Sequence, residues 1–141
     1  MSEVAIAMIE CDGRWLLQLR DDIEGILYPG QWALFGGHLD PGETPAAALR
    51  RELEEEINWA ESDLPPWFEL RDAQRIRHFF RGPLAVPLES LTLLEGQDMV
   101  VAALDELLSG SIWSPKCQQW RPLAPSLQRA VQELKKERDQ A

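Results

Sequence analysis

Short apolar runs separated by turn residues predict β-strands in the first third of the chain. Residues 4–9 and 15–19 form two such runs on either side of Asp12-Gly13, a pattern that predicts a hairpin. Residues 20–31 contain two glycines and a proline and are predicted to form a loop. Residues 32–35 form a third short run that leads into a glycine pair, so a third strand is expected there.

The clearest helical pattern covers residues 44–58. The Thr44 hydroxyl can cap a free backbone amide, and Pro45 suits the first helical position because it has no N–H to leave unpaired. Apolar residues follow at intervals of three and four, which places them on one stripe that should face the core: Ala46, Leu49, Leu53 and Ile57.

The rest of the chain predicts shorter elements. Alternation in residues 67–88 favours one or two strands, residues 99–104 form another apolar strand, and residues 105–108 form a helical turn. Ser126 is the expected N-cap of a terminal helix, whose polar end, residues 135–140, should fray. This order of strands and helices favours an α/β fold in which helices cover a mixed sheet.

Length and charge favour a single-domain protein and disfavour one that binds a nucleic-acid polymer. The chain has 141 residues, enough for one compact domain spanning residues 1–141. Its net charge of −10 disfavours a nucleic-acid polymer as partner, although a small phosphorylated ligand can bind beside a local cation. No apolar run reaches the roughly 20 residues that span a bilayer, and residues 1–10 lack a targeting pattern. No membrane association and a cytoplasmic location are therefore expected.

The predicted helix carries an unusual group of acids. Glu52, Glu55 and Glu56 lie at spacings of three and four and should converge beside the apolar stripe. Repulsion between such like charges costs about 0.2–0.5 kcal/mol, and acids near a helix C-terminus cost roughly 0.3–1 kcal/mol more. A hard cation such as magnesium, manganese or calcium would offset this cost. The alternative is a solvated acidic face with no ligand.

The spacing of these residues resembles the signature of the Nudix hydrolases. The signature begins at Gly37, places Glu43 after five residues, and ends in Arg51-Glu52-Leu53, Glu55-Glu56, Asn58 and Trp59. Asn58 stands where the family has glycine. Because asparagine also tolerates the left-handed conformation that ends many helices, the turn after the helix is expected to survive.

The resemblance implies an α/β/α sandwich with a mixed central sheet and a Mg²⁺ site, in which Mn²⁺ can replace Mg²⁺. It implies that Glu52, Glu55 and Glu56 bind the metal, that the Gly36 carbonyl can join them, and that Glu43 and Arg51 hold the loop and the helix in register. Family members often recruit a further acid from a later loop. Glu95 is the candidate, with a simple turn carboxylate as the alternative. Glu52, Glu55 and Glu95 are all candidates for the general base.

The implied substrate is a small nucleotide with a diphosphate linkage. A nucleoside triphosphate pyrophosphohydrolase is expected, with a nucleotide-sugar hydrolase, a nucleotide sensor that does not cut and a calcium-binding structural helix as alternatives. Arg77 is a candidate phosphate contact in an arginine-rich strand region, which could instead be a solvated sheet edge. His38 and His78 are assigned no catalytic role. A monomer and a homodimer both remain open.

Overall fold

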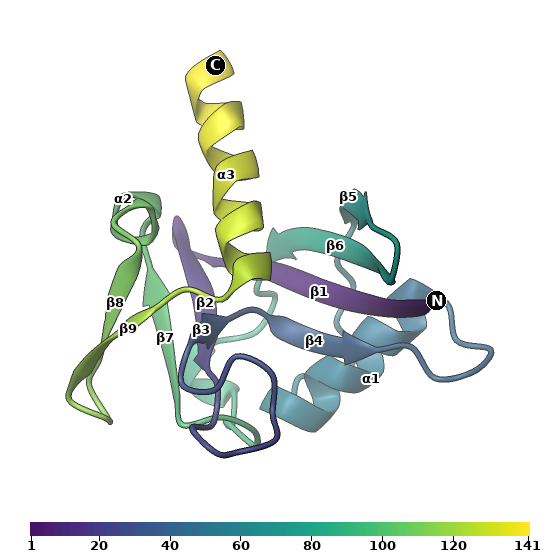
Figure 1. Cartoon of the computed structure of the whole chain (residues 1–141), viewed down its shortest axis with the longest axis horizontal. Helices are drawn as coiled ribbons and strands as arrows, with labels where there is room; N and C mark the ends of the chain where they lie inside the picture. Colours follow the sequence, from purple (N-terminus) through teal and green to yellow (C-terminus); the bar gives the residue numbers. More distant parts are fainter. The chain divides into compact units, whose positions relative to one another are not determined.

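A computed structural model describes residues 1–141, and the chain folds into two compact units. The first unit consists of Met1–Cys11 and Phe35–Glu95, and the second of Asp12–Leu34 and Gly96–Ala141. Each unit thus combines two separate stretches of sequence (Figure 1). The expectation of a single domain over the whole chain stays a prediction.

The first unit is a mixed sheet with one helix. Its central strand β1 (Ser2–Cys11) pairs antiparallel with β4 (Phe35–His38) and parallel with β6 (Arg75–Pro83). β6 also pairs antiparallel with β5 (Pro66–Arg71), and α1 (Pro45–Ile57) packs against β4 and β1 (Figure 1). A short 3₁₀ helix, Leu88–Ser90, precedes the end of this unit. The expected α/β fold with a mixed sheet is confirmed.

The core of the first unit is formed by side chains of α1, of the turn after it, of strand β4 and of both faces of strands β1 and β6. Its side chains are almost entirely removed from water, which is the main favourable contribution to folding. They are Val4, Ala5, Ala7, Met8, Ile9, Phe35, Ala48, Leu49, Leu53, Ile57, Trp59, Phe79 and Phe80.

Helix α1 begins and ends as its sequence predicts. The Thr44 hydroxyl accepts a hydrogen bond from the Ala47 amide at 3.1 Å, and Pro45 occupies the first turn. At the other end Asn58 adopts φ 56° and ψ 33°, so asparagine does replace glycine in a left-handed cap. One detail of the apolar stripe was wrong: Ala48 is fully buried, whereas Ala46 is partly exposed.

The second unit contains an antiparallel sheet. In it β2 (Arg14–Leu19) pairs with β3 (Trp32–Ala33) and with β7 (Asp98–Ala102). The turn before β2 has φ values of 50° at Asp12 and 80° at Gly13, as expected for a tight turn of these two residues.

The remaining elements of the second unit follow β7 along the chain. They are α2 (Leu104–Leu108), the hairpin of β8 (Ser111–Ser114) and β9 (Gln119–Pro122), and α3 (Pro125–Gln140). Helix α3 packs against α2 and β3 and buries Leu127, Ala130, Val131 and Leu134. None of the three helices is long and apolar enough to cross a membrane.

A buried polar network ties β7 to the β8–β9 hairpin. The Asp98 carboxylate is buried and accepts hydrogen bonds from the Ser114 hydroxyl at 2.7 Å, the Met99 amide at 2.8 Å and the Lys116 amide at 3.3 Å. A buried carboxylate is tolerated only with such partners, so this network is a structural requirement of the unit.

The structure differs from the sequence analysis at four further points. The strand predicted at 32–35 is two strands, β3 and β4, which pair with different neighbours, and the glycine pair lies inside β4. The β8–β9 hairpin was not predicted. Helix α3 begins at Pro125 behind Ala124, so Ser126 is not the N-cap. The polar end of that helix remains helical to Gln140, with an ion pair of 2.9 Å between Lys135 and Asp139.

Candidate active site

Two glycines of β4 bring the sheet close to the acidic face of α1. A Cβ atom on Gly37 would lie 2.6 Å and 2.7 Å from the two carboxylate oxygens of Glu52, so a larger residue at this position would displace the end of that side chain. Gly36 adopts φ 146°, and a Cβ there would collide with the Ala5 carbonyl of β1. The structure thus identifies Glu52 as the group that closely approaches Gly37.

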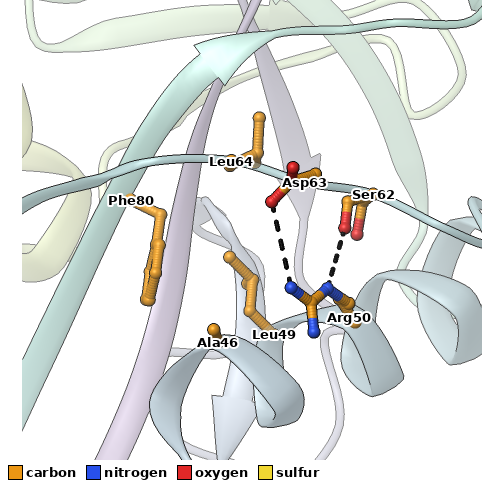
Figure 2. Close-up of a pocket in the computed structure, with 7 residues that line it drawn as sticks. All are labelled: Ala46, Leu49, Arg50, Ser62, Asp63, Leu64 and Phe80. Carbon is orange, nitrogen blue, oxygen red and sulfur yellow. Dashed lines mark hydrogen bonds and ion pairs between the residues drawn. The ribbon is translucent and has the colours of Figure 1, made fainter.

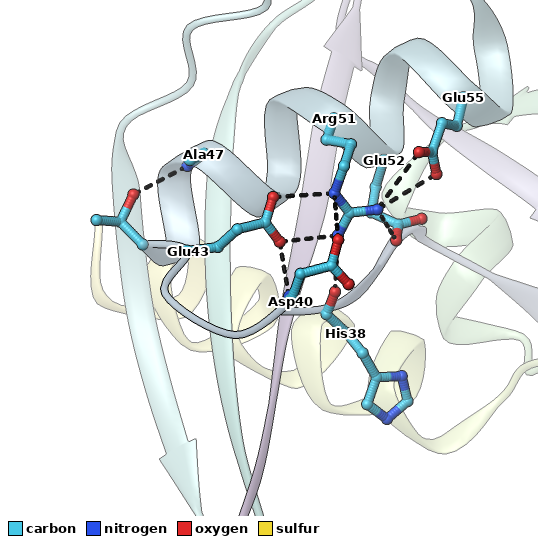
Figure 3. A network of polar contacts seen from close by, with 8 residues as sticks. His38, Asp40, Glu43, Ala47, Arg51, Glu52 and Glu55 are labelled. Atoms are coloured by element: carbon cyan, nitrogen blue, oxygen red, sulfur yellow. Dashed lines mark hydrogen bonds and ion pairs between the residues drawn. The ribbon is translucent and has the colours of Figure 1, made fainter.

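Arg51 lies at the centre of a network that joins the loop before α1 to the helix itself (Figure 3). Its Nε and Nη2 atoms each lie 2.9 Å from an oxygen of Glu43, a two-pronged contact of the strong charge-assisted type. Nη2 also donates to the His38 carbonyl at 3.0 Å, and Nε lies 3.4 Å from Asp40. Arg51 and Glu43 therefore hold the loop on the helix.

The third guanidinium nitrogen of Arg51, Nη1, faces two of the acids on α1. It donates to Glu52 at 2.9 Å and lies 3.3 Å from Glu55 one turn later (Figure 3). The Glu52 side chain is 16% exposed and that of Glu55 is 58% exposed, so Glu55 is the freer of the two. Glu43 raises the pKa of Arg51, and the Arg51 guanidinium lowers the pKa of Glu43.

Glu56 is the buried acid of the group. Only 4% of its surface is exposed, and its Oε1 accepts a hydrogen bond from the Gly36 amide at 2.8 Å. Burial, followed by a hydrogen bond with the Glu95 carboxyl group, raises the pKa of Glu56 to about 10. Burial also raises the pKa of Glu52, because it outweighs the opposing effect of Arg51. A hydrogen bond between two carboxyl groups requires a proton on one of them.

Glu95 reaches this place because the end of α1 binds the segment before it. The Thr92 amide donates to the Ile57 carbonyl at 3.2 Å, and the Leu94 amide donates to the Glu56 carbonyl at 2.8 Å. The last carbonyl groups of a helix have no partners inside the helix. Here the backbone amides of the segment before Glu95 supply the donors. The next residue along the chain is Glu95.

The neighbouring arginines of the sequence have other partners. Arg50 points to the connector after α1, where its Nε donates to the Ser62 carbonyl at 3.2 Å and its Nη2 lies 3.8 Å from Asp63, beside a small pocket (Figure 2). Arg77 binds Asp72 at 2.9 Å and lowers the pKa of that carboxyl to about 2. Arg77 thus pairs with Asp72 in this structure, and its contact with phosphate stays a prediction.

The acidic group has the right chemistry for a hard metal ion but is arranged around Arg51. No three His, Cys, Asp or Glu side chains stand in a ready-made metal site. The carboxyl groups of Glu52 and Glu55 bind the Arg51 guanidinium. The backbone group of Gly36 that contacts Glu56 is the amide, whereas the resemblance implied the Gly36 carbonyl as a metal ligand. Oxygen donors of this kind suit magnesium or manganese. A cation bound between the adjacent carboxyl groups of Glu56 and Glu95 would offset the repulsion between their negative charges.

Comparison with known proteins identifies the family. Residues 1–126 match the NUDIX domain. The chain belongs to the Nudix family. The nucleoside triphosphatases NudI of Salmonella typhimurium and Salmonella arizonae are 42% and 41% identical to it over 81 residues. The match spans 56% of this chain and 56% of each relative, so it covers little more than half of these proteins.

Solved structures of other Nudix proteins share the fold. The MutT NUDIX hydrolase of Burkholderia pseudomallei superimposes with a TM-score of 0.70 at 21% identity and covers 93% of this chain and 95% of its own. The ORF135 protein of E. coli gives 0.69 at 27% identity, with 98% and 91% covered. MutT of Methanosarcina mazei gives 0.71 at 21% identity, with 97% and 94% covered.

Proposed function

We propose that this Nudix protein is a divalent-metal-dependent hydrolase that cleaves the diphosphate linkage of a nucleoside triphosphate. One observation supports the proposal: four carboxyl groups are linked in a chain of contacts, in which two lie against the glycine pair of β4, one hydrogen-bonds to a member of that pair of acids, and one shares Arg51 with the other. They belong to Glu52, Glu55, Glu56 and Glu95. The Nudix family supports action on a pyrophosphate bond, and relatives named nucleoside triphosphatase support the substrate class.

The residues of the site have two roles in this proposal, metal binding and positioning of the metal ligands. Magnesium or manganese, held by the four acids and the Gly36 carbonyl, would neutralise phosphate charge and lower the pKa of the attacking water. Glu43 and Arg51 position the acids, since they fix the loop against the helix. The Gly36 amide orients Glu56.

The general base is one of three residues in this arrangement. Glu95 lies close enough to Glu52 for its charge to contribute to the raised pKa of Glu52, and Glu55 is the most exposed acid of the signature. A base must lie within hydrogen-bond reach of the water that it deprotonates, and an exposed flexible side chain can adjust to that requirement. Glu55 is therefore the first residue to test.

The decisive experiment is a substrate screen with three forms of the protein. Nucleoside triphosphates, nucleotide sugars and dinucleotides are incubated with Mg²⁺ and the native chain, Glu55→Gln or Glu54→Gln, and phosphate or pyrophosphate release is measured. Glu54 is the matched control because it is exposed on the same helix and is not one of the signature acids. Glu55→Gln should lower kcat by about 10²–10⁴ if Glu55 is the base, and Glu54→Gln should not. Native turnover in Glu55→Gln would remove Glu55 from the catalytic set.

The same screen separates the alternatives. A nucleotide-sugar hydrolase would release product from the sugar conjugates and leave the triphosphates intact. A sensor would bind a nucleotide without product release, but it would have no need for all four acids. A calcium-binding helix would show calcium affinity and no hydrolysis of any substrate.

A further inference from the structure

Strand β5 is the exposed edge of the sheet in the first unit. It pairs with β6 and lies at the end of the strand order (Figure 1). The side chains of Glu69 and Arg71 are 46% and 61% exposed. An exposed edge presents backbone groups that can pair with another strand, so its residues decide which partner it accepts.

The hairpin fixes which backbone groups of β5 point outward. The Asp72 amide donates to the Arg75 carbonyl at 3.0 Å, and Asp72 also accepts hydrogen bonds from the Gln74 and Arg75 amides through its side chain. Pairs in an antiparallel ladder alternate between hydrogen-bonded and non-hydrogen-bonded. Counting from Asp72, Leu70 faces β6, whereas the N–H and C=O groups of Glu69 and Arg71 face away from it.

This alternation limits how β5 can pair with a second copy of itself. In a two-fold antiparallel arrangement, outward-facing residues must stand opposite outward-facing residues. Glu69 can therefore face Glu69, Arg71 can face Arg71, or Glu69 can face Arg71. The first two registers place like charges opposite each other, which is unfavourable, and the third places opposite charges together at two equivalent positions.

We propose that β5 pairs with β5 of a second copy of this chain, with Glu69 opposite Arg71 of that copy and Leu70 at the two-fold axis. Both Glu69–Arg71 pairs lie at hydrogen-bonded positions, and each exchanges two backbone hydrogen bonds. Within one chain these side chains already form an ion pair of 3.0 Å. Pairing of two copies therefore closes a ring of four alternating charges. Pro66, which lacks an N–H, lies outside the overlapping residues 68–72.

The proposal is tested by the mass of the protein in solution. Sedimentation equilibrium is measured over a wide range of concentration for the native chain, Glu69→Arg and Arg71→Glu, with Glu89→Arg as the control for a change of exposed charge. The native chain and the control should approach twice the monomer mass as concentration rises. Each single variant should dimerise about tenfold more weakly or worse, because both pairs then carry like charges.

Mixing the two single variants gives the sharper result. The Glu69→Arg chain carries arginine at both positions and the Arg71→Glu chain carries glutamate at both, so the mixture should form a heterodimer although each variant alone does not. Far-ultraviolet circular dichroism verifies that both variants fold. A native chain that keeps the monomer mass at every concentration would overturn the proposal, as would single variants that dimerise as the native chain does.

Discussion

The buried carboxyl group of Glu56 makes the stability of the metal-free protein depend on pH. Its pKa lies at about 10 in the folded chain against an ordinary value of 4.5, because burial and Glu95 oppose ionisation. Between these values the folded state binds more protons than the unfolded state, so stability is lost as pH rises above 4.5. One pKa unit corresponds to about 1.4 kcal/mol, so the loss between pH 4.5 and pH 7 is about 3 kcal/mol.

Glu56→Gln should remove this dependence. Glutamine keeps the oxygen that accepts from the Gly36 amide at 2.8 Å, offers an N–H to Glu95, and cannot ionise. In a chelating buffer the variant should therefore equal the native chain near pH 5 and exceed it by up to about 3 kcal/mol at pH 7. Urea unfolding at several pH values measures both free energies.

Magnesium provides the second arm of this test. A cation bound to ionised Glu56 stabilises the folded state in proportion to its occupancy, so Mg²⁺ should stabilise the native chain and have less effect on Glu56→Gln. Sodium at equal ionic strength should do less than magnesium, since screening alone is weak at a buried site. Parallel pH profiles for the two proteins, together with equal responses to magnesium, would refute the reasoning.

Three further substitutions test individual contacts. Gly37→Ala should lower activity, because the added methyl displaces the Glu52 carboxylate, but should cost less than about 1 kcal/mol in thermal unfolding, because the end of that flexible side chain can move. Asn58→Ala should cost about 1 kcal/mol in urea unfolding, whereas Asn58→Gly should be neutral or stabilising, since φ is 56° there; equal effects would contradict the cap. Ser114→Ala should cost about 1–3 kcal/mol because buried Asp98 loses a donor, and unchanged melting would show that another group replaces it.

Features that depend on near neighbours in sequence were predictable. Thr44 and Pro45 determine the start of α1 because capping needs only the next few amides, and the spacing of Glu52, Glu55 and Glu56 determines which side of the helix they share. The strand content of residues 67–88 followed from alternation, and both strands are present. These signals are local, so the rest of the fold does not alter them.

Features that depend on competition between local signals were less predictable. Ser126 is a good capping residue, yet the helix begins two residues earlier than a Ser126 cap would place it, because Pro125 has a φ suited to the first turn and no N–H that needs a partner. The β8–β9 hairpin has strands of four residues, too short for alternation to stand out. Its exposed Trp113 and Trp120 stand opposite each other, and only the paired structure shows their contact at 5.7 Å between ring centroids.

The position of Glu95 shows why the residues of a candidate site are harder to predict than the helix that carries most of them. From sequence, Glu95 could be a turn carboxylate or a site acid, and nothing adjacent to it decides between the two. Its place in the fold depends on the carbonyl groups of Glu56 and Ile57, which need donors from outside α1 and obtain them from Leu94 and Thr92. The unpaired carbonyl groups at the end of a helix hold the segment whose amides bind to them. Backbone hydrogen bonds therefore determine where Glu95 lies, and its own side chain does not. Replacing Leu94 with proline would remove one of these donors and should separate Glu95 from Glu56 while both acids remain in the sequence.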